Sequence, residues 1–426
     1  MIAAAALAWI FAGASSAWGV DRGAAGTYVS IPDSIASESG SVLAVERGLF
    51  FVPENRSRPA SRVIAVQFLR FESLDPAVAA GQTKRPPVFL LAGGPGSEFD
   101  FSKPSIFRKV QRLRQTRDVV YVSQRGNPRA AGLVPPLWLP TLAIPLDEPG
   151  SAARTRERDR AALTQSLAEW TAKGLDLFGY DILNIVDDLH DLRAALGYDK
   201  IVLCACSFGS QWSFAYIKRW PETVDRALLS GVEPLDYAYD SPKWLWASMT
   251  RLARSAEADP KLAPRIPHGG LMKVIRTLTT QLEAHPVKAS ITDPATGKSV
   301  EIALGAEDLR AAIADTSTFD GATKRDRLTH WPRFLIELSE SDYRYLAAKT
   351  WEKRTQPPRE VLILPLIDNS LGITPARDAK IVAEREARWL GDINAYYHNT
   401  RVIWSPHPTS ATGFAPTGTS RFRCCC

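Results

Sequence analysis

Short apolar runs bounded by turn-forming residues recur along this chain, and between the later runs apolar positions stand three to four residues apart. The first pattern predicts β-strands and the second predicts amphipathic helices. Ile182–Leu196 shows the helical spacing and stops at Gly197. This alternation predicts the α/β class, with a mostly parallel eight-stranded sheet covered by helices on both faces. The predicted strands are Leu49–Val52, Arg62–Phe71, Val88–Ala92, Asp118–Ser123, Lys200–Ala205, Arg226–Gly231, Glu360–Leu366 and Arg401–Ser405.

The interval between the sixth and seventh predicted strands is too long for a simple loop. It reads as helices interrupted by one polar, turn-rich piece, Thr292–Lys298. We therefore expect a helical cap at 236–358, inserted between a first core segment at 40–235 and a second at 359–407. The helices predicted in the cap are Pro242–Ala258, Gly270–Ala284, Ala306–Ala314 and Trp331–Lys349.

The composition is that of a globular protein and argues against nucleic-acid binding. The chain has 426 residues, of which 45% are hydrophobic and 23% charged, as in a globular protein with a large core. The net charge is +6, but the basic residues are dispersed, and acidic residues interrupt clusters such as Arg154–Arg160. Nucleic acid is therefore not an expected partner. The five cysteines show neither metal-ligand spacing nor a disulfide framework, so no metal is expected.

The two ends of the chain differ from the rest. Residues 1–19 are Ala-rich and apolar, which predicts a secretory signal peptide and an exported protein. No Lys or Arg precedes Arg22, so the basic residues typical of a signal peptide's start are missing. A retained N-terminal membrane anchor is the alternative, because the apolar stretch is just long enough to span a membrane. No later segment is long and apolar enough to span a membrane. Residues 408–426 are rich in Thr, Ser, Gly and Pro, end in three cysteines, and read as an irregular tail resembling a frame-shifted terminus.

One serine stands at a junction that favours nucleophilic chemistry. The apolar run Ile201–Ala205 leads into Cys206-Ser207-Phe208-Gly209, and a helix-compatible segment follows directly. This pattern predicts a sharp strand-to-helix turn that exposes the Ser207 hydroxyl above the sheet edge. Small residues are needed on both sides, because strand and helix nearly touch there. The alternative is an ordinary helix N-cap.

A glycine-rich loop, Gly93-Gly-Pro-Gly96, follows the third predicted strand. In acyl-transfer enzymes such a loop supplies one N–H group that binds the oxyanion, and the amide after the nucleophile supplies another. Gly94 is the preferred donor in this loop, with Gly93 second, because Pro95 has no N–H. Phe208 would supply the second donor. A plain Gly-Pro turn is the alternative.

Together these segments make the chain resemble the α/β-hydrolases and, among them, the proline iminopeptidase and tripeptidyl aminopeptidase family of serine peptidases. The resemblance rests on Gly93–Gly96, on Asp118–Gly126 and on the Ser207 turn. It runs from about Leu49 to Leu235 and resumes from Glu360 to about Ser405. The family has Asp-x-Arg-Gly where this chain has Ser123-Gln-Arg-Gly126. The resemblance implies an acyl-enzyme mechanism without a cofactor.

A serine nucleophile of this fold needs an acid and a histidine that follow it in the chain. Asp368 follows the seventh predicted strand and precedes Thr-Pro, as the family's acid does. Only His398 and His407 come after it. His407 follows the eighth predicted strand, where the family's histidine loop belongs, although its Pro-His-Pro context differs from the family's glycine-rich one. His398 precedes that strand and is expected to cap a helix.

Aminopeptidases of this family bind the substrate's free ammonium with acidic residues near the cap. Glu233 and Asp236 are the candidates for that role. The sequence thus predicts a serine hydrolase that cleaves amide bonds at peptide N-termini, with proline-directed cleavage as one option. A carboxylesterase of the same fold and a catalytically impaired hydrolase-like binding protein are the alternatives. The expected ligand is a peptide or a small ester or amide, and the oligomeric state is not indicated.

Overall fold

The computed structural model describes residues 23–83, 85–127, 137–140, 142, 144–293, 295–317, 325–355, 361–384, 389–401 and 403. The expected signal peptide at 1–19 and the tail at 408–426 lie outside these residues. Among the helices that are described, none combines the length and the apolar character required to cross a membrane.

A seven-stranded sheet forms the base of the described structure, in the order β1-β2-β3-β5-β4-β6-β7. The strands β5, β4, β6 and β7 pair in parallel, whereas β1, β2, β3 and β5 pair antiparallel. The first six predicted strands are confirmed as β2 to β7. The strand bounds are β1 Tyr28–Ala36, β2 Val42–Pro53, β3 Val63–Phe71, β4 Val88–Leu91, β5 Val119–Val122, β6 Ile201–Cys206 and β7 Val224–Ser230.

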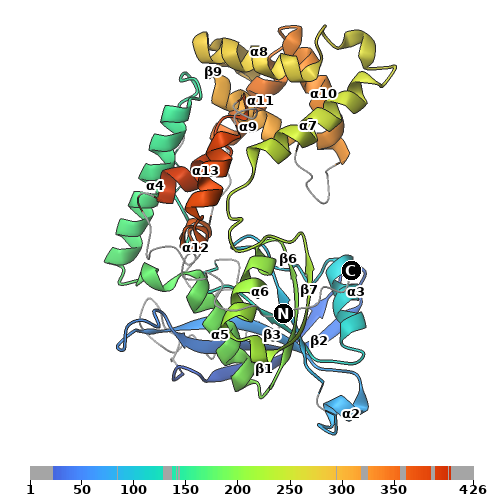
Figure 1. The fold of residues 1–426 in the computed structure, drawn as a ribbon, viewed down its shortest axis with the longest axis vertical. Helices are drawn as coiled ribbons and strands as arrows, with labels where there is room; N and C mark the ends of the chain where they lie inside the picture. The colour runs from blue at the N-terminus through green and yellow to red at the C-terminus, as the bar shows by residue number, and fades with distance from the viewer. Residues whose placement is uncertain are drawn as a thin grey trace.

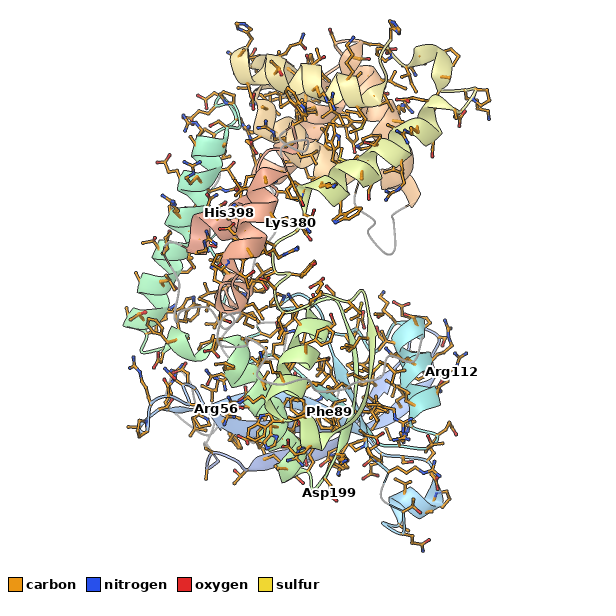
Figure 2. All side chains as sticks on the ribbon, in the orientation of Figure 1. Arg56, Phe89, Arg112, Asp199, Lys380 and His398 are labelled. Carbon is orange, nitrogen blue, oxygen red and sulfur yellow. The ribbon has the colours of Figure 1, made fainter. Side chains whose placement is uncertain are left out.

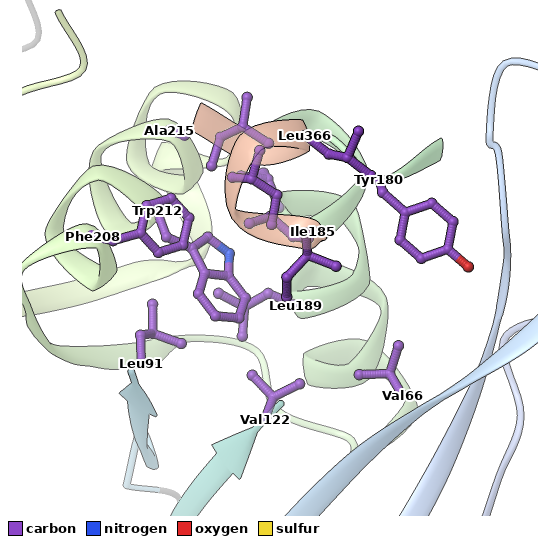
Figure 3. Close-up of a cluster of buried hydrophobic side chains, with 14 of the residues drawn as sticks. Val66, Leu91, Val122, Tyr180, Ile185, Leu189, Phe208, Trp212, Ala215 and Leu366 are labelled. Carbon is purple, nitrogen blue, oxygen red and sulfur yellow. The ribbon is translucent and has the colours of Figure 1, made fainter. Parts of the chain in front are cut away.

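Helices cover both faces of this sheet, as predicted. On one face, α5 (Ile182–Ala195), α6 (Phe208–Arg219) and α12 (Ile363–Leu371) pack on the strands. Figure 3 shows Val66, Leu91 and Val122 from three strands meeting helix side chains that include Trp212 and Leu366. On the other face, α3 (Pro104–Leu113) buries Phe107 and Val110 against the strands.

The predicted strand at Glu360–Leu366 is wrong, because α12 forms there. The sheet has seven strands in the described part of the chain, where eight were predicted. A continuous apolar run does not distinguish a buried strand from a helix that is buried all round. Pro365 falls in the first turn of α12, where its missing N–H would have had no partner. Of the predicted strand Arg401–Ser405, Arg401 instead ends α14 (Ala395–Arg401), and most of the remainder lies outside the described residues.

A second hydrophobic cluster lies in the region expected to form the cap. Figure 1 shows its helices gathered apart from the sheet, with α4, α13 and α12 between the two groups. This region is not wholly helical, because β8 and β9 form an antiparallel hairpin around the polar piece 292–298. The helix predicted at Trp331–Lys349 is two helices, separated where Ser341 adopts a φ of 63°. The elements are α7 Pro242–Glu257, α8 Leu271–Ala284, β8 Val287–Thr292, β9 Ser299–Leu304, α9 Ala306–Ser317, α10 Arg325–Ser339 and α11 Arg344–Thr355.

Among the remaining helices, α4 is the longest. The long α4 packs against α14, and α14 in turn packs against α12. Their bounds, with those of the short 3-10 helices, are α2 Pro76–Ala79, α4 Ala152–Ala172, η1 Leu177–Gly179, η2 Pro221–Thr223, η3 Ala263–Arg265 and α13 Pro375–Ala383.

Candidate active site

Ser207 occupies the sharp turn that joins β6 to α6. Its backbone has φ 56° and ψ −134°, a conformation that residues other than glycine rarely adopt. The Ser207 N–H donates to Ser230 O at 3.1 Å, which ties the turn to the end of β7. The predicted strand-to-helix turn is therefore present, and Ser207 is not an ordinary N-cap, since its side chain makes no cap hydrogen bond.

Two glycines allow the neighbouring backbones to approach this turn. A Cβ on Gly209 would lie 2.6 Å from Leu91 O, so α6 could not pack so closely on β4 with any other residue there. A Cβ on Gly93 would lie 3.2 Å from the Ser207 Cβ. The glycine-rich loop therefore touches the serine directly, and Ala205 is accommodated as a buried strand residue.

The loop itself is a tight turn that requires glycine at its second position. Gly94 has a φ of 107°, and a Cβ there would lie 2.6 Å from Gly96 N. Phe208 is the first residue of α6, where N–H groups lack intrahelical acceptors and carry the positive end of the helix dipole. The loop and the start of the helix thus converge on Ser207, as two oxyanion donors must.

The segment after β5 anchors this arrangement. Arg125 is fully buried, with a bidentate ion pair to Asp188, and it also donates to the carbonyl of Gly179 at 2.7 Å. It serves the fold and not the chemistry. The Ser123 hydroxyl donates to Glu98, just beyond the glycine loop.

Glu233 is the hydrogen-bond partner of the candidate nucleophile. The Ser207 Oγ donates to Glu233 Oε1 at 3.0 Å, and the Ser210 Oγ accepts from the Glu233 N–H at 2.8 Å. Burial raises the pKa of the Glu233 carboxyl, and the nearby charge of Asp240 adds to that rise, while the hydrogen bond from Ser207 opposes it. A half-buried carboxylate thus faces the serine hydroxyl.

Comparison with known proteins agrees with this geometry. Residues 86–267 match the family model of the alpha/beta hydrolase fold, a span that includes the glycine loop, Ser207 and Glu233. This chain has the α/β-hydrolase fold. It is also 25% identical, over 199 residues, to the serine protease Hip1 of Mycobacterium tuberculosis and Mycobacterium bovis. That match covers 44% of this chain and 36% of the length of those relatives.

Solved structures that are similar to this chain were also found, at low sequence identity. One is Cfl2 from Burkholderia cenocepacia, at 13% identity and a TM-score of 0.29, covering 76% of this chain and 78% of that one. Another is carboxylesterase CesB from Bacillus subtilis, at 13% identity and a TM-score of 0.24, covering 61% of this chain and 60% of that one.

The expected acid lies in α12, not after a strand. Asp368 is only 5% exposed and accepts a hydrogen bond from the Tyr397 side chain. Burial raises the pKa of its carboxyl well above 3.8; the hydrogen bond from Tyr397 opposes this rise, and the charge of Glu233 adds to it. Asp368 and Glu233 therefore lie within electrostatic reach of one another.

The other acidic candidate, Asp236, has a structural task. Its carboxylate accepts from the Thr374 backbone N–H at 2.7 Å and from the Thr374 hydroxyl at 2.6 Å. Thr374 is the N-cap of α13, so Asp236 fixes the start of that helix. It is not free to bind a substrate ammonium.

Among the histidines, His398 and His190 have partners of their own. His407 lies outside the described part of the chain. His398 is held by Asp392 and stacks on Tyr239 at a centroid distance of 5.2 Å. In Figure 2 it lies at the level of Lys380 and away from Phe89 of the sheet. His190 stacks on Trp220 at 3.8 Å. Within the described ranges, no group of His, Cys, Asp and Glu could hold a metal ion.

Proposed function

We propose that this α/β hydrolase is a serine hydrolase that acts through an acyl-enzyme. The observation that carries the proposal is the Ser207 turn, strained at φ 56° and in contact with the Gly93 loop. Ser207 Oγ attacks a substrate carbonyl carbon and forms a tetrahedral intermediate. The N–H groups of Gly94 and Phe208 bind the oxyanion, the leaving group departs, and water then hydrolyses the acyl-enzyme.

The proton of Ser207 needs a base, and we propose His407 for that role, with Asp368 as its orienting acid. A carboxylate has four lone-pair sites, so Asp368 can accept from Tyr397 and still accept from an imidazole N–H. An imidazolium beside it would also favour its ionised form, against the burial that raises its pKa.

Glu233 supports cleavage at a free N-terminus. In an α-amino acyl group the ammonium nitrogen and the scissile carbonyl carbon are separated by one Cα, which is about 2.5 Å. A substrate carbonyl attacked by Ser207 therefore places its own α-ammonium within reach of the carboxylate that now lies 3.0 Å from Ser207 Oγ. Two further residues would move the ammonium about 7 Å away. The geometry thus favours release of a single N-terminal residue over release of a tripeptide.

The proposed nucleophile is tested by labelling with a fluorophosphonate, which reacts with activated serines. We expect wild type and Ser213→Ala to be labelled and Ser207→Ala to stay unlabelled. Ser213 is a matched control, because it is a buried serine of the same helix whose hydroxyl donates to Gly209 O. Equal labelling of wild type and Ser207→Ala, or no labelling of either, would contradict the proposal; the second result fits an impaired binding protein.

The proposed specificity is tested with aminoacyl amides, their N-acetylated forms and short-chain esters. We expect cleavage of the free-amine amides, poor cleavage of the acetylated ones, and a Glu233→Gln variant whose KM rises for the free-amine substrates only. Losing one charge-assisted hydrogen bond should raise that KM about 10-fold or more. Cleavage of esters alone would instead identify a carboxylesterase.

A further inference from the structure

Gln124 spans the two ends of the glycine-rich loop with a single side chain. It follows β5, is 3% exposed, and its Oε1 accepts from the Gly96 N–H at 2.8 Å. Its Nε2 donates to the Gly93 carbonyl oxygen at 3.1 Å. The orientation of this amide is set by its partners, since Gly96 offers only a donor and Gly93 only an acceptor at these atoms. Both polar ends of the side chain are therefore occupied by the loop.

The contact with Gly93 bears on the expected oxyanion donor. The Gly93 C=O and the Gly94 N–H belong to one planar peptide unit, and in a trans unit they point in opposite directions. A side chain that holds the oxygen therefore also fixes the direction of the N–H. Gly94 has no Cβ and a φ of 107°, so its own backbone preferences would not hold that plane.

We propose that Gln124 is a positioning residue that holds the Gly93–Gly94 peptide so that the Gly94 N–H faces the oxyanion. The proposal rests on the serine-hydrolase function proposed above. Gln124 itself does not touch the substrate. It acts by keeping the donor aligned before the reaction, which is where oxyanion stabilisation gains its advantage over water.

Three variants separate this role from a merely structural one. Gln124→Leu removes both hydrogen bonds, whereas Gln124→Glu keeps an acceptor for the Gly96 N–H and cannot donate to Gly93 O. Ser123→Ala is the matched control: Ser123 is the adjacent buried residue, and its hydroxyl binds Glu98, not the Gly93–Gly94 peptide.

The kinetic test is the fluorophosphonate reaction, resolved into probe affinity and maximal labelling rate. Removing an oxyanion donor costs about 10²–10³ in rate, so misaligning one should lower the maximal rate at least 10-fold. We expect that loss in both Gln124 variants, with probe affinity within about 2-fold of wild type and Ser123→Ala close to wild type. A wild-type maximal rate in Gln124→Glu would overturn the proposal, and thermal melting shows whether each variant is folded.

Hydrogen exchange supplies a readout that does not depend on activity. The Gly96 amide should be protected in wild type and in Gln124→Glu, and it should exchange faster in Gln124→Leu. Equal Gly96 protection in wild type and Gln124→Leu refutes the clamp even if the protein is an active hydrolase. If the wild-type protein does not react with the probe and Gln124→Leu still loses the Gly96 protection, the proposed function is contradicted and the clamp remains supported.

Discussion

Ser207 and Asp368 belong to two regions that the chain builds in different ways. Ser207 stands between a parallel strand and its helix, where close contacts with Gly93 and the β7 hydrogen bond at Ser230 define the backbone. Asp368 stands in a helix that is buried on all sides, and its carboxyl meets Tyr397. The first region is specified by short local motifs. The second depends on how the C-terminal helices pack, which no short motif encodes.

The two strands at this end of the sheet, β6 and β7, also differ in how well they are buried. β6, next to Ser207, is buried between β4 and β7, whereas β7 is the last strand of the described sheet and leaves Leu228 57% exposed. Covered parallel strands are stabilised on both faces, and an uncovered edge strand is not. The strand that leads into Ser207 is therefore better supported than its neighbour β7.

The largest effect expected in testing these two regions is the loss of labelling when a histidine is replaced. His407→Ala should slow fluorophosphonate labelling about 10³-fold or more, because a positioned base contributes about 10²–10⁴ and acts together with the nucleophile. His398→Ala should label within about 2-fold of wild type, since His398 is engaged by Asp392 and Tyr239. The reverse pattern would show that the second half of the site is built from α14.

The Ser207 region could be predicted from sequence because its residues are adjacent in the chain or follow predicted strands. The Ser207 turn and the Gly93 loop each carry a local signature, and β4 and β6 are neighbours in the sheet. The position of Gln124 after β5 was visible in the sequence, but its contacts with the loop were not. Such a contact depends on the register between β4 and β5.

The structure of the C-terminal region could not be predicted from the sequence, for a different reason. The apolar run around Pro365 fits a buried strand and a buried helix equally well, and only packing against α5 and α14 distinguishes them. The contact between Tyr397 and Asp368 could not be predicted from the sequence either, because the two residues lie on different helices. The α5 helix, by contrast, could be predicted at Ile182–Leu196 from its spacing alone and is confirmed with its end one residue earlier.

A smaller effect concerns the charge of Asp368. Because burial holds its folded-state pKa well above 3.8, the folded protein keeps a proton that the unfolded chain releases. The stability from this group is thus fully present below about pH 4 and is lost as pH rises through the folded pKa. Asp368→Asn cannot titrate, so its free energy of unfolding should improve relative to wild type as pH rises.

Urea unfolding of both proteins at several pH values measures that difference. A difference that does not change with pH would mean that Asp368 is ionised in the folded protein. That outcome would contradict the raised pKa of the buried Asp368 carboxyl. It would indicate a cationic neighbour, such as the proposed imidazolium.

The smallest effect tests whether the Ser207 turn stores strain. Ser207→Gly and Ser207→Ala both remove the hydroxyl that donates to Glu233, but only alanine keeps a Cβ at φ 56°. Relieving such a conformation is worth about 1 kcal/mol or more, so the glycine variant should be the more stable of the two. The same pair at Ser210, inside α6, should show the opposite order by about 1 kcal/mol, because glycine weakens a helix. Urea midpoints of the four variants measure both orders. If the alanine variant is the more stable one at both positions, the Ser207 turn is no more strained than the helix that follows it.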